Sequence, residues 1–319
     1  MKILAIQNRM GIGDMVIFLP YIEAVAKKYN SQVTLLVKEN SKAEHLIKDN
    51  KYINEIIILK RDQTKKSFHD GLNGFFRLVS DIKKYQFDKV LIFNSSLRYK
   101  LVCKFAGIND IYQYPLFKKK NQHIIEAANK LLKNNFNLEI KSDPVIDVKD
   151  ENIQKIKLKF NFSDEVKNIL LGIGGSGPTK RIPPKVFIEF MNLCLKNFKC
   201  RFFLATGNKN EEIEIMNEIL SYHKNLCTPL NQLSISETLP VIKNCNIAVC
   251  NDSSFSHLSA GLGKPTIVLM SDTPLIYGSY SSKMHPIMPD GVEKVTHGTD
   301  GKEQINPLKI FEKFQSLVN

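Results

Sequence analysis

The sequence is informative first for what it lacks. None of its 6 cysteines belongs to a C-x-x-C pair, so free thiols in a reducing compartment are expected rather than a zinc ribbon or a disulfide framework. No apolar run approaches the ~18 residues of a membrane-spanning helix. The N-terminal stretch loses its apolar character at Gln7, and is therefore not expected to be a signal peptide. These absences favour a protein of the cytoplasm.

Several motifs of nucleotide and acyl chemistry are also missing. No two aspartates stand at positions i and i+2, so a metal-bridged diphosphate site of the Asp-x-Asp kind has no candidate. The segment GIG at 11–13 follows a predicted strand, but the third glycine of a dinucleotide-binding loop would fall on Val16. Pro178 stands where a P-loop needs lysine, and Ser176 lacks the second glycine of a nucleophile elbow.

The composition describes an ordinary globular protein with an excess of positive charge. The chain has 319 residues, 43% of them hydrophobic, which favours two domains with normal cores. The formal net charge of +13 suits an anionic membrane surface, nucleic acid or a phosphorylated substrate. Its lysines are spread along the whole chain, however, and the only local cluster is FKKKNQH at 117–123. No aromatic-rich RNA-binding motif accompanies that cluster, so no nucleic-acid partner is expected.

Short β-branched runs alternate with amphipathic helical patterns from the N-terminus onward. This alternation predicts parallel βαβ units, and hence a doubly wound α/β sheet. The predicted strands are Lys2–Ile6, Val33–Val37, Glu55–Leu59 and Lys89–Phe93, and the predicted helices cover 14–29, 41–48, 75–84, 97–105 and 123–133.

The alternation breaks between Phe136 and Ser163 and then starts again. The interrupting stretch contains KSDPVIDVKDENIQ, whose Asp-Pro step and mixed charges are typical of a linker. We therefore expect a first domain over 1–150 and a second over 151–319, with their sheets facing each other across a cleft. The later predicted strands are 168–172, 201–205, 247–250 and 266–270, and the later helices are 184–196, 211–221, 236–243 and 307–318.

Three loops combine glycine with charged or hydroxyl groups, and each follows a predicted strand, at the edge where open parallel sheets bind ligands. In RMGIGD at 9–14, Asp14 is either a functional carboxylate or the cap of a helix. In GIGGSGPTKR at 172–181, Lys180 and Arg181 next to a glycine-rich backbone suit a diphosphate, or form a solvated surface loop.

The third loop lies in CNDSSFSHLSAGLGKP at 250–265. Asp252 ends a strand, and Ser253 and Ser254 precede a helix whose first N–H groups can hold phosphate, although serine is also an ordinary N-cap. His257 falls in the first turn, where it fits either a ligand contact or a packed, hydrogen-bonded residue. The small residues at 259–261 allow this helix to lie close to the sheet.

Taken together and in their order, these segments resemble glycosyltransferase family nine, the heptosyltransferases of the lipopolysaccharide inner core. MGIGDMVIFLP resembles the N-terminal Gly-Asp motif, and GSGPTKRIPPKVF resembles the donor-phosphate loop. TGNKNEE is similar to the ribose-binding segment, and NDSSFSHLSAGLGKPTIVLM resembles the Asp-Thr-Gly-x-x-His motif. The resemblance implies a GT-B fold of two Rossmann-like domains, the first binding the acceptor and the second the nucleotide-sugar, with the last helix packing back toward the N-terminal domain.

The resemblance also implies metal-independent, inverting transfer of a sugar, without a cofactor, from a donor such as ADP-heptose to lipopolysaccharide or another surface glycan. Asp14 falls on the catalytic base, Lys180 on the lysine that holds donor phosphate, and Glu211, or its neighbour Glu212, near the ribose-binding acid. The remaining expected donor contacts are Gly13, Ser176, Arg181, Asp252, Ser253, Ser254 and His257.

Three positions depart from the family pattern. Ser254 replaces a glycine, Ile17 stands where a histidine often follows Gly-Asp, and Ile182 replaces an aromatic residue. These departures bear on donor choice more than on the class of reaction. Two alternatives stay open: a sugar-nucleotide epimerase or hydrolase of the same fold, and a non-catalytic basic protein that binds nucleic acid or anionic surfaces. A lipid-linked acceptor would add transient contact with the inner face of the cytoplasmic membrane.

Overall fold

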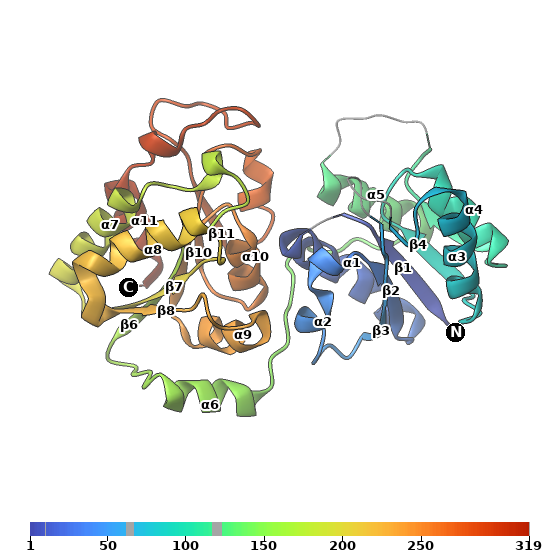
Figure 1. Ribbon diagram of the computed structural model, residues 1–319, viewed down its shortest axis with the longest axis horizontal. Helices are drawn as coiled ribbons and strands as arrows, with labels where there is room; N and C mark the ends of the chain where they lie inside the picture. The colour runs from blue at the N-terminus through green and yellow to red at the C-terminus, as the bar shows by residue number, and fades with distance from the viewer. Residues whose placement is uncertain (10, 62–66, 117–122, 319) are drawn as a thin grey trace. The chain divides into compact units, whose positions relative to one another are not determined.

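A computed structural model describes residues 1–9, 11–61, 67–116 and 123–318. The chain forms two compact units, Met1–Ser142 and Asp143–Asn319, each built around a parallel sheet covered by helices (Figure 1). The prediction of two doubly wound α/β domains is therefore confirmed. The units divide a few residues before position 150, where the sequence placed the boundary, and most of the basic cluster at 117–123 lies outside the described residues.

The first unit contains a five-stranded parallel sheet in the order β3-β2-β1-β4-β5. Its strands are β1 (Ile3–Gln7), β2 (Val33–Val37), β3 (Ile53–Ile58), β4 (Lys89–Ile92) and β5 (Asp110–Gln113). Its helices are α1 (Ile12–Tyr29), α2 (Ala43–Leu46), α3 (Gly71–Lys83), α4 (Leu97–Phe105) and α5 (Ile124–Phe136). Every residue of β1 and β2 is buried, as expected for a sheet with helices on both faces.

The second unit contains a six-stranded parallel sheet in the order β11-β10-β9-β6-β7-β8. Its strands are β6 (Lys167–Gly172), β7 (Cys200–Ala205), β8 (Cys227–Pro229), β9 (Ile247–Asn251), β10 (Thr266–Leu269) and β11 (Met284–Ile287). Its helices are α6 (Asp150–Lys159), α7 (Pro184–Asn197), α8 (Asn210–His223), α9 (Ile235–Asn244), α10 (Ser254–Gly261) and α11 (Pro307–Val318).

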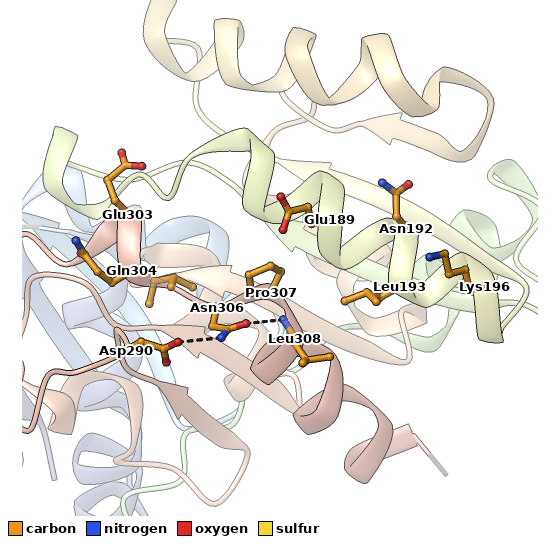
Figure 2. Close-up of a pocket in the computed structure, with 11 residues that line it drawn as sticks. Glu189, Asn192, Leu193, Lys196, Asp290, Glu303, Gln304, Asn306, Pro307 and Leu308 are labelled. Carbon is orange, nitrogen blue, oxygen red and sulfur yellow. Dashed lines mark hydrogen bonds between the residues drawn. The ribbon is translucent and has the colours of Figure 1, made fainter.

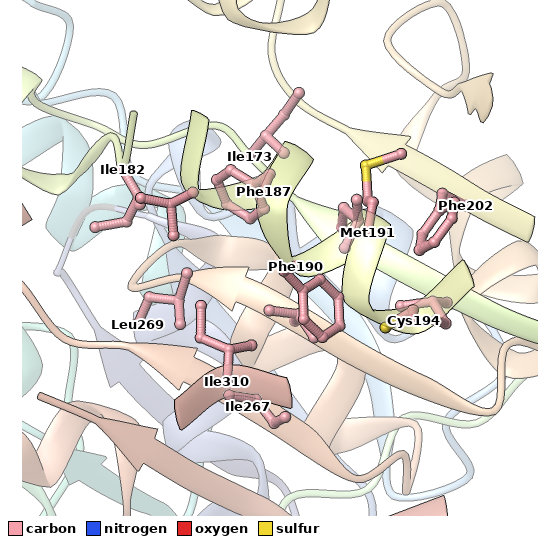
Figure 3. Packing of buried hydrophobic residues seen from close by; sticks show 14 of the residues in the cluster. Ile173, Ile182, Phe187, Phe190, Met191, Cys194, Phe202, Ile267, Leu269 and Ile310 are labelled. Atoms are coloured by element: carbon pink, nitrogen blue, oxygen red, sulfur yellow. The ribbon is translucent and has the colours of Figure 1, made fainter. Parts of the chain in front are cut away.

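The core of the second unit explains one departure from the family pattern. Ile182 is fully buried and packs with Phe187 and Leu269 in a cluster of aliphatic and aromatic side chains (Figure 3). At this position, a large apolar side chain serves packing under α7. The last helix, α11, joins the same core through Phe314, whose ring centroid lies 5.7 Å from that of Phe190 on α7.

The segment that enters the second unit is held on it by specific bonds. The Asp143 carboxylate accepts hydrogen bonds of 2.7 Å from the Ser281 hydroxyl and from the backbone N–H of Ser282. Three residues later, the N–H of Ile146 donates to the carbonyl of Gly261 at 2.8 Å, and the Ile146 side chain is buried. The stretch that reads as a linker is thus part of the second unit from Asp143 onward.

Candidate functional site

The carboxyl edge of the second sheet brings the two C-terminal loops together. In the register of the central strands, Gly172 of β6 lies beside Cys250 of β9, so the loop after β6 and the turn at Asp252 leave the sheet side by side. The buried amide of Asn251 joins them, because its Nδ2 donates to the carbonyls of Ile173 at 2.8 Å and Gly174 at 3.2 Å.

An ion pair connects the two loops. Lys180 Nζ lies 2.8 Å from Asp252 Oδ2, and the Thr273 hydroxyl donates to the same oxygen. The Asp252 side chain is only 5% exposed, and that of Lys180 is 24% exposed. Burial alone would raise the pKa of Asp252, but the charges of Lys180 and His257 and the two hydrogen bonds outweigh it, so this pKa lies below its usual value. The pair therefore places an ionised carboxylate beside a partly accessible ammonium group.

The start of α10 lies directly after this carboxylate. Ser253 is the N-cap residue, yet its side chain makes no capping hydrogen bond, and its hydroxyl oxygen is buried without a partner among the described residues. The half-buried Ser254 opens the helix. Because the first N–H groups of a helix lack intrahelical acceptors, this turn offers donors and a positive dipole end to an anion. Ser253 therefore does not cap α10 through its side chain, which was the alternative interpretation of this residue.

His257 is a buried, hydrogen-bonded residue of the same helix. Its Nδ1 lies 2.9 Å from the Tyr280 hydroxyl, and the two rings stack with centroids 5.6 Å apart. When protonated, this imidazole helps to lower the pKa of the adjacent Asp252.

A hydrogen bond to Glu212, the second of the two neighbouring acids on α8, holds the glycine-rich loop on this helix. Glu212 is buried and its Oε1 accepts a 3.0 Å hydrogen bond from the backbone N–H of Gly175, whereas Glu211 is exposed. A Cβ at Gly174 would lie 2.6 Å from that oxygen, so a larger residue there would displace the Glu212 carboxylate from its present position. The Arg181 Nε donates a 3.2 Å hydrogen bond to the Gly175 carbonyl in the same loop. The Ser176 side chain is exposed.

In the first unit, Asp14 lies in the first turn of α1. Gly11 precedes this helix with φ of 117°, a conformation that favours glycine. The Asp14 carboxylate, 17% exposed, forms a 2.7 Å ion pair with Arg9, and Gly13 lies half-buried next to it. At the preceding strand end, Gln7 is fully buried, and neither polar atom of its amide has a partner among the described residues. The RMGIGD loop thus ends on a carboxylate paired with Arg9 and follows a strand that ends on an unsatisfied amide.

Comparisons with known proteins agree with this arrangement. A family profile described as glycosyltransferase family 9 (heptosyltransferase) matches residues 75–288. The chain belongs to glycosyltransferase family 9. It is similar to lipopolysaccharide heptosyltransferase 1 of Campylobacter coli, with 24% identity over 159 residues, which are 49% of this chain and 46% of that protein. The matching segment thus spans about half the length of that relative.

Solved structures of this family share the fold over the whole chain. The E. coli ADP-heptose lipopolysaccharide heptosyltransferase II superposes with a TM-score of 0.74 at 18% identity, covering 100% of this chain and 98% of that one. A family 9 glycosyltransferase of Veillonella parvula gives a TM-score of 0.78 at 16% identity, covering 99% of this chain and 97% of that one. The two parallel α/β domains are therefore those of a GT-B protein.

The family profile does not cover every residue of the candidate site. The matched residues 75–288 include Lys180, Glu212 and Asp252 but begin after Asp14, so the match does not bear on the predicted role of Asp14. Sequence reasoning missed Asn251, Thr273 and Tyr280 as parts of the site. Asn251 adjoins Asp252 and could have been suspected, because an asparagine at the end of a buried strand needs partners.

A separate hollow in the second unit shares no residue with this site. It has a volume of about 720 Å³ and is lined by one side of α7 and by the residues that lead into α11 (Figure 2). Asn306, one of its lining residues, accepts a hydrogen bond from Leu308 N and donates one to Asp290. No helix among the described residues is long and apolar enough to cross a bilayer, and no cluster of three or more potential metal-ligating side chains occurs among them.

Proposed function

We propose that this protein transfers a heptose-like sugar from a nucleotide-diphosphate donor, ADP-heptose or similar, to lipopolysaccharide or another surface glycan. The observation that carries the proposal is the ion pair between Lys180 and Asp252 beside the start of α10, within a chain of glycosyltransferase family 9. This arrangement offers a cation and helix N–H groups to a diphosphate, and a carboxylate to sugar hydroxyl groups. The family match favours transfer over the alternatives of epimerisation or non-catalytic binding.

The proposed reaction is a single displacement. The acceptor hydroxyl gives its proton to Asp14 while its oxygen attacks C1 of the donor sugar. The bond from C1 to the diphosphate oxygen breaks, and its electron pair leaves with the diphosphate. Lys180, Arg181 and the start of α10 stabilise that developing charge, so the proposal assigns no step to a metal ion. Attack opposite the leaving group inverts the configuration at C1.

Donor recognition divides between the sugar and the nucleotide. Asp252, Ser253 and Ser254 face the sugar and the diphosphate, and Glu212 rather than Glu211 contacts the ribose, because only the Glu212 side chain reaches the glycine-rich loop. Asp252→Ala should then impair binding of the intact donor and spare the free nucleotide. A lipid-linked acceptor would further bring this protein, acting from the cytoplasm, to the inner face of the membrane.

The test is a transfer assay with ADP-heptose and a deacylated acceptor, on wild type and Asp14→Asn. The variant keeps the size of the side chain and removes its basicity, so turnover should fall by about 10²–10⁴-fold while donor affinity stays near wild type. EDTA should leave turnover unchanged. Wild-type turnover in Asp14→Asn would return Asp14 to a helix-terminal role, and donor hydrolysis without transfer would replace the transferase by a hydrolase.

A further inference from the structure

One face of the first unit carries a concentration of exposed apolar side chains. Helices α3 and α4 lie side by side on the same face of the sheet (Figure 1). Of the 12 exposed large apolar residues among those described, 6 belong to these two helices and the loop before α3, so they are not scattered singly over the surface. We call this surface the α3–α4 face; it consists of Phe68, Leu72, Phe76, Leu97, Leu101 and Phe105.

The spacing of these residues forms one apolar row on each helix, and aromatic contacts link the two rows. Leu72 and Phe76 are one turn apart on α3, and Leu97, Leu101 and Phe105 follow each other at one-turn intervals on α4. Phe75 bridges the helices, because its ring centroid lies 5.2 Å from that of Phe76 and 5.8 Å from that of Phe105. Exposed fractions of 79% for Leu72, 59% for Phe76 and 60% for Phe105 leave these side chains in water.

Folding does not require this exposure. Both helices bury a different set of residues against the sheet, among them Leu78 and Ile82 on α3 and Val102 and Cys103 on α4. An apolar surface on the opposite side adds nothing to that core and marks an interaction site when it is contiguous.

Cations are interleaved with the apolar side chains. The Arg77 guanidinium lies 4.6 Å from the Phe68 ring centroid, and that of Arg98 lies 5.5 Å from the Phe75 ring centroid. Helix α4 carries Arg98, Lys100 and Lys104 and has no acidic residue. The nearby acids are already paired, Asp70 with Arg61 and Asp81 with Lys84 and His69, so they do not cancel this charge.

We propose that the α3–α4 face docks on an anionic lipid bilayer, with its phenylalanine and leucine side chains at the headgroup boundary and its cations on lipid phosphates. Exposed apolar residues rimmed by Lys and Arg are what peripheral binding to such a surface requires. A second copy of the chain fits less well, because two faces rich in cations, on chains of net charge +13, repel each other. The inference rests on the proposed function, in which the acceptor is carried on a lipid.

The experiment is co-sedimentation of the full chain with vesicles of phosphatidylcholine alone or mixed equally with phosphatidylglycerol, without donor or acceptor. Wild type should bind the anionic vesicles at low salt and lose binding at high salt. The triple variant Leu72→Ser, Phe76→Ser, Phe105→Ser should bind at least tenfold more weakly. Lys100→Gln should lower the affinity about fivefold. The matched controls are Leu158→Ser, Tyr222→Ser, Leu308→Ser and, for charge, Lys224→Gln; they should bind like wild type.

Three results would overturn the proposal: equal binding of wild type to neutral and anionic vesicles, wild-type binding by the α3–α4 triple variant, or an oligomer without vesicles that the triple variant dissociates. The last would make the face a contact between copies. Thermal unfolding checks that the triple variant is folded. The vesicles carry no substrate, so loss of vesicle binding would leave the transferase proposal standing. Conversely, failed transfer with intact vesicle binding would overturn only the transferase proposal.

Discussion

At the scale of single residues, Asp252 is the centre of the proposed donor site. A buried carboxylate is costly unless it is paired, and here Lys180 and Thr273 both bind it, with His257 close enough to add its charge. The same contacts hold Lys180 in place with part of its ammonium group accessible. The ion pair therefore keeps the cation oriented before any diphosphate arrives, so the lysine loses less freedom when the donor binds.

Lys180→Met should make stability depend on pH in a defined way. The pKa of Asp252 is lowered in the folded protein, so its pairing stabilises the fold above the unfolded-state pKa of about 3.9 and ceases to do so as pH falls through the folded-state pKa. The variant should lose about 2 kcal/mol of unfolding free energy at pH 7, and the difference from wild type should shrink below pH ~4. Urea unfolding at pH 7 and pH 3.5 measures it; a constant difference would contradict the pairing.

The two neighbouring acids of α8 allow a matched pair of variants. Glu212→Gln weakens the acceptor of the Gly175 N–H bond and removes the charge proposed to bind ribose, so nucleotide affinity should fall about tenfold. Glu211→Gln changes the same charge one position earlier on an exposed side chain and should bind like wild type. Isothermal titration with ADP distinguishes them. Equal losses would indicate a general effect of charge, and a loss confined to Glu211→Gln would reverse the assignment.

At the scale of elements, the glycine-rich loop and α8 fit closely at the proposed donor site. Gly174→Ala would place a methyl group 2.6 Å from Glu212 Oε1 and 3.0 Å from Thr206 Oγ1, so the Glu212 carboxylate must move from its position on the Gly175 N–H. At Gly177 a Cβ meets nothing within 4 Å, and φ is −145°, which any residue adopts. Gly174→Ala should weaken ADP binding about tenfold or more, whereas Gly177→Ala should not. Similar affinities in both variants would show that the loop adapts.

Some strands and helices could be predicted from the sequence and others could not. Buried β-branched strands such as β2 and β6 were predictable, because both faces of a covered parallel sheet demand apolar residues. The strands β5, β8 and β11 were missed, since they are only 3–4 residues long and at least partly exposed. Helix α6 was missed because Ile156 is its only buried residue, which leaves no apolar stripe to detect.

Some residues of the candidate site were likewise predictable from the sequence, and others were not. Asp252 and Lys180 follow strand ends, so the rule for parallel sheets predicted them at one edge, and the ion pair confirms that they meet. Thr273 and Tyr280 lie 21 and 23 residues from their partners Asp252 and His257. Their contacts depend on how β10 and its following loop fold back, which no local pattern encodes. Glu212 was separable from Glu211 only once the helix face was known.

At the scale of the whole molecule, all the proposed donor contacts except Gly13 belong to one unit. Lys180, Glu212 and Asp252 lie within 143–319, and this unit has its own sheet and core. Its entry segment adds the bonds of Asp143 to Ser281 and Ser282 and the buried side chain of Ile146. A unit with a complete core and a complete ligand site should fold and bind without the remainder of the chain.

We therefore predict that a fragment of residues 143–319 folds cooperatively and binds ADP within about threefold of the full chain, since it keeps every proposed nucleotide contact, but transfers no sugar because it lacks Asp14. A fragment of residues 151–319, cut at the boundary expected from the sequence, loses the Asp143 and Ile146 contacts. It should unfold at a temperature several degrees lower, as expected for the loss of a buried isoleucine and three hydrogen bonds. Circular dichroism and calorimetry compare the two. Equal melting temperatures would place the boundary after residue 150, and loss of ADP binding in the longer fragment would mean that the first unit contributes to the nucleotide site.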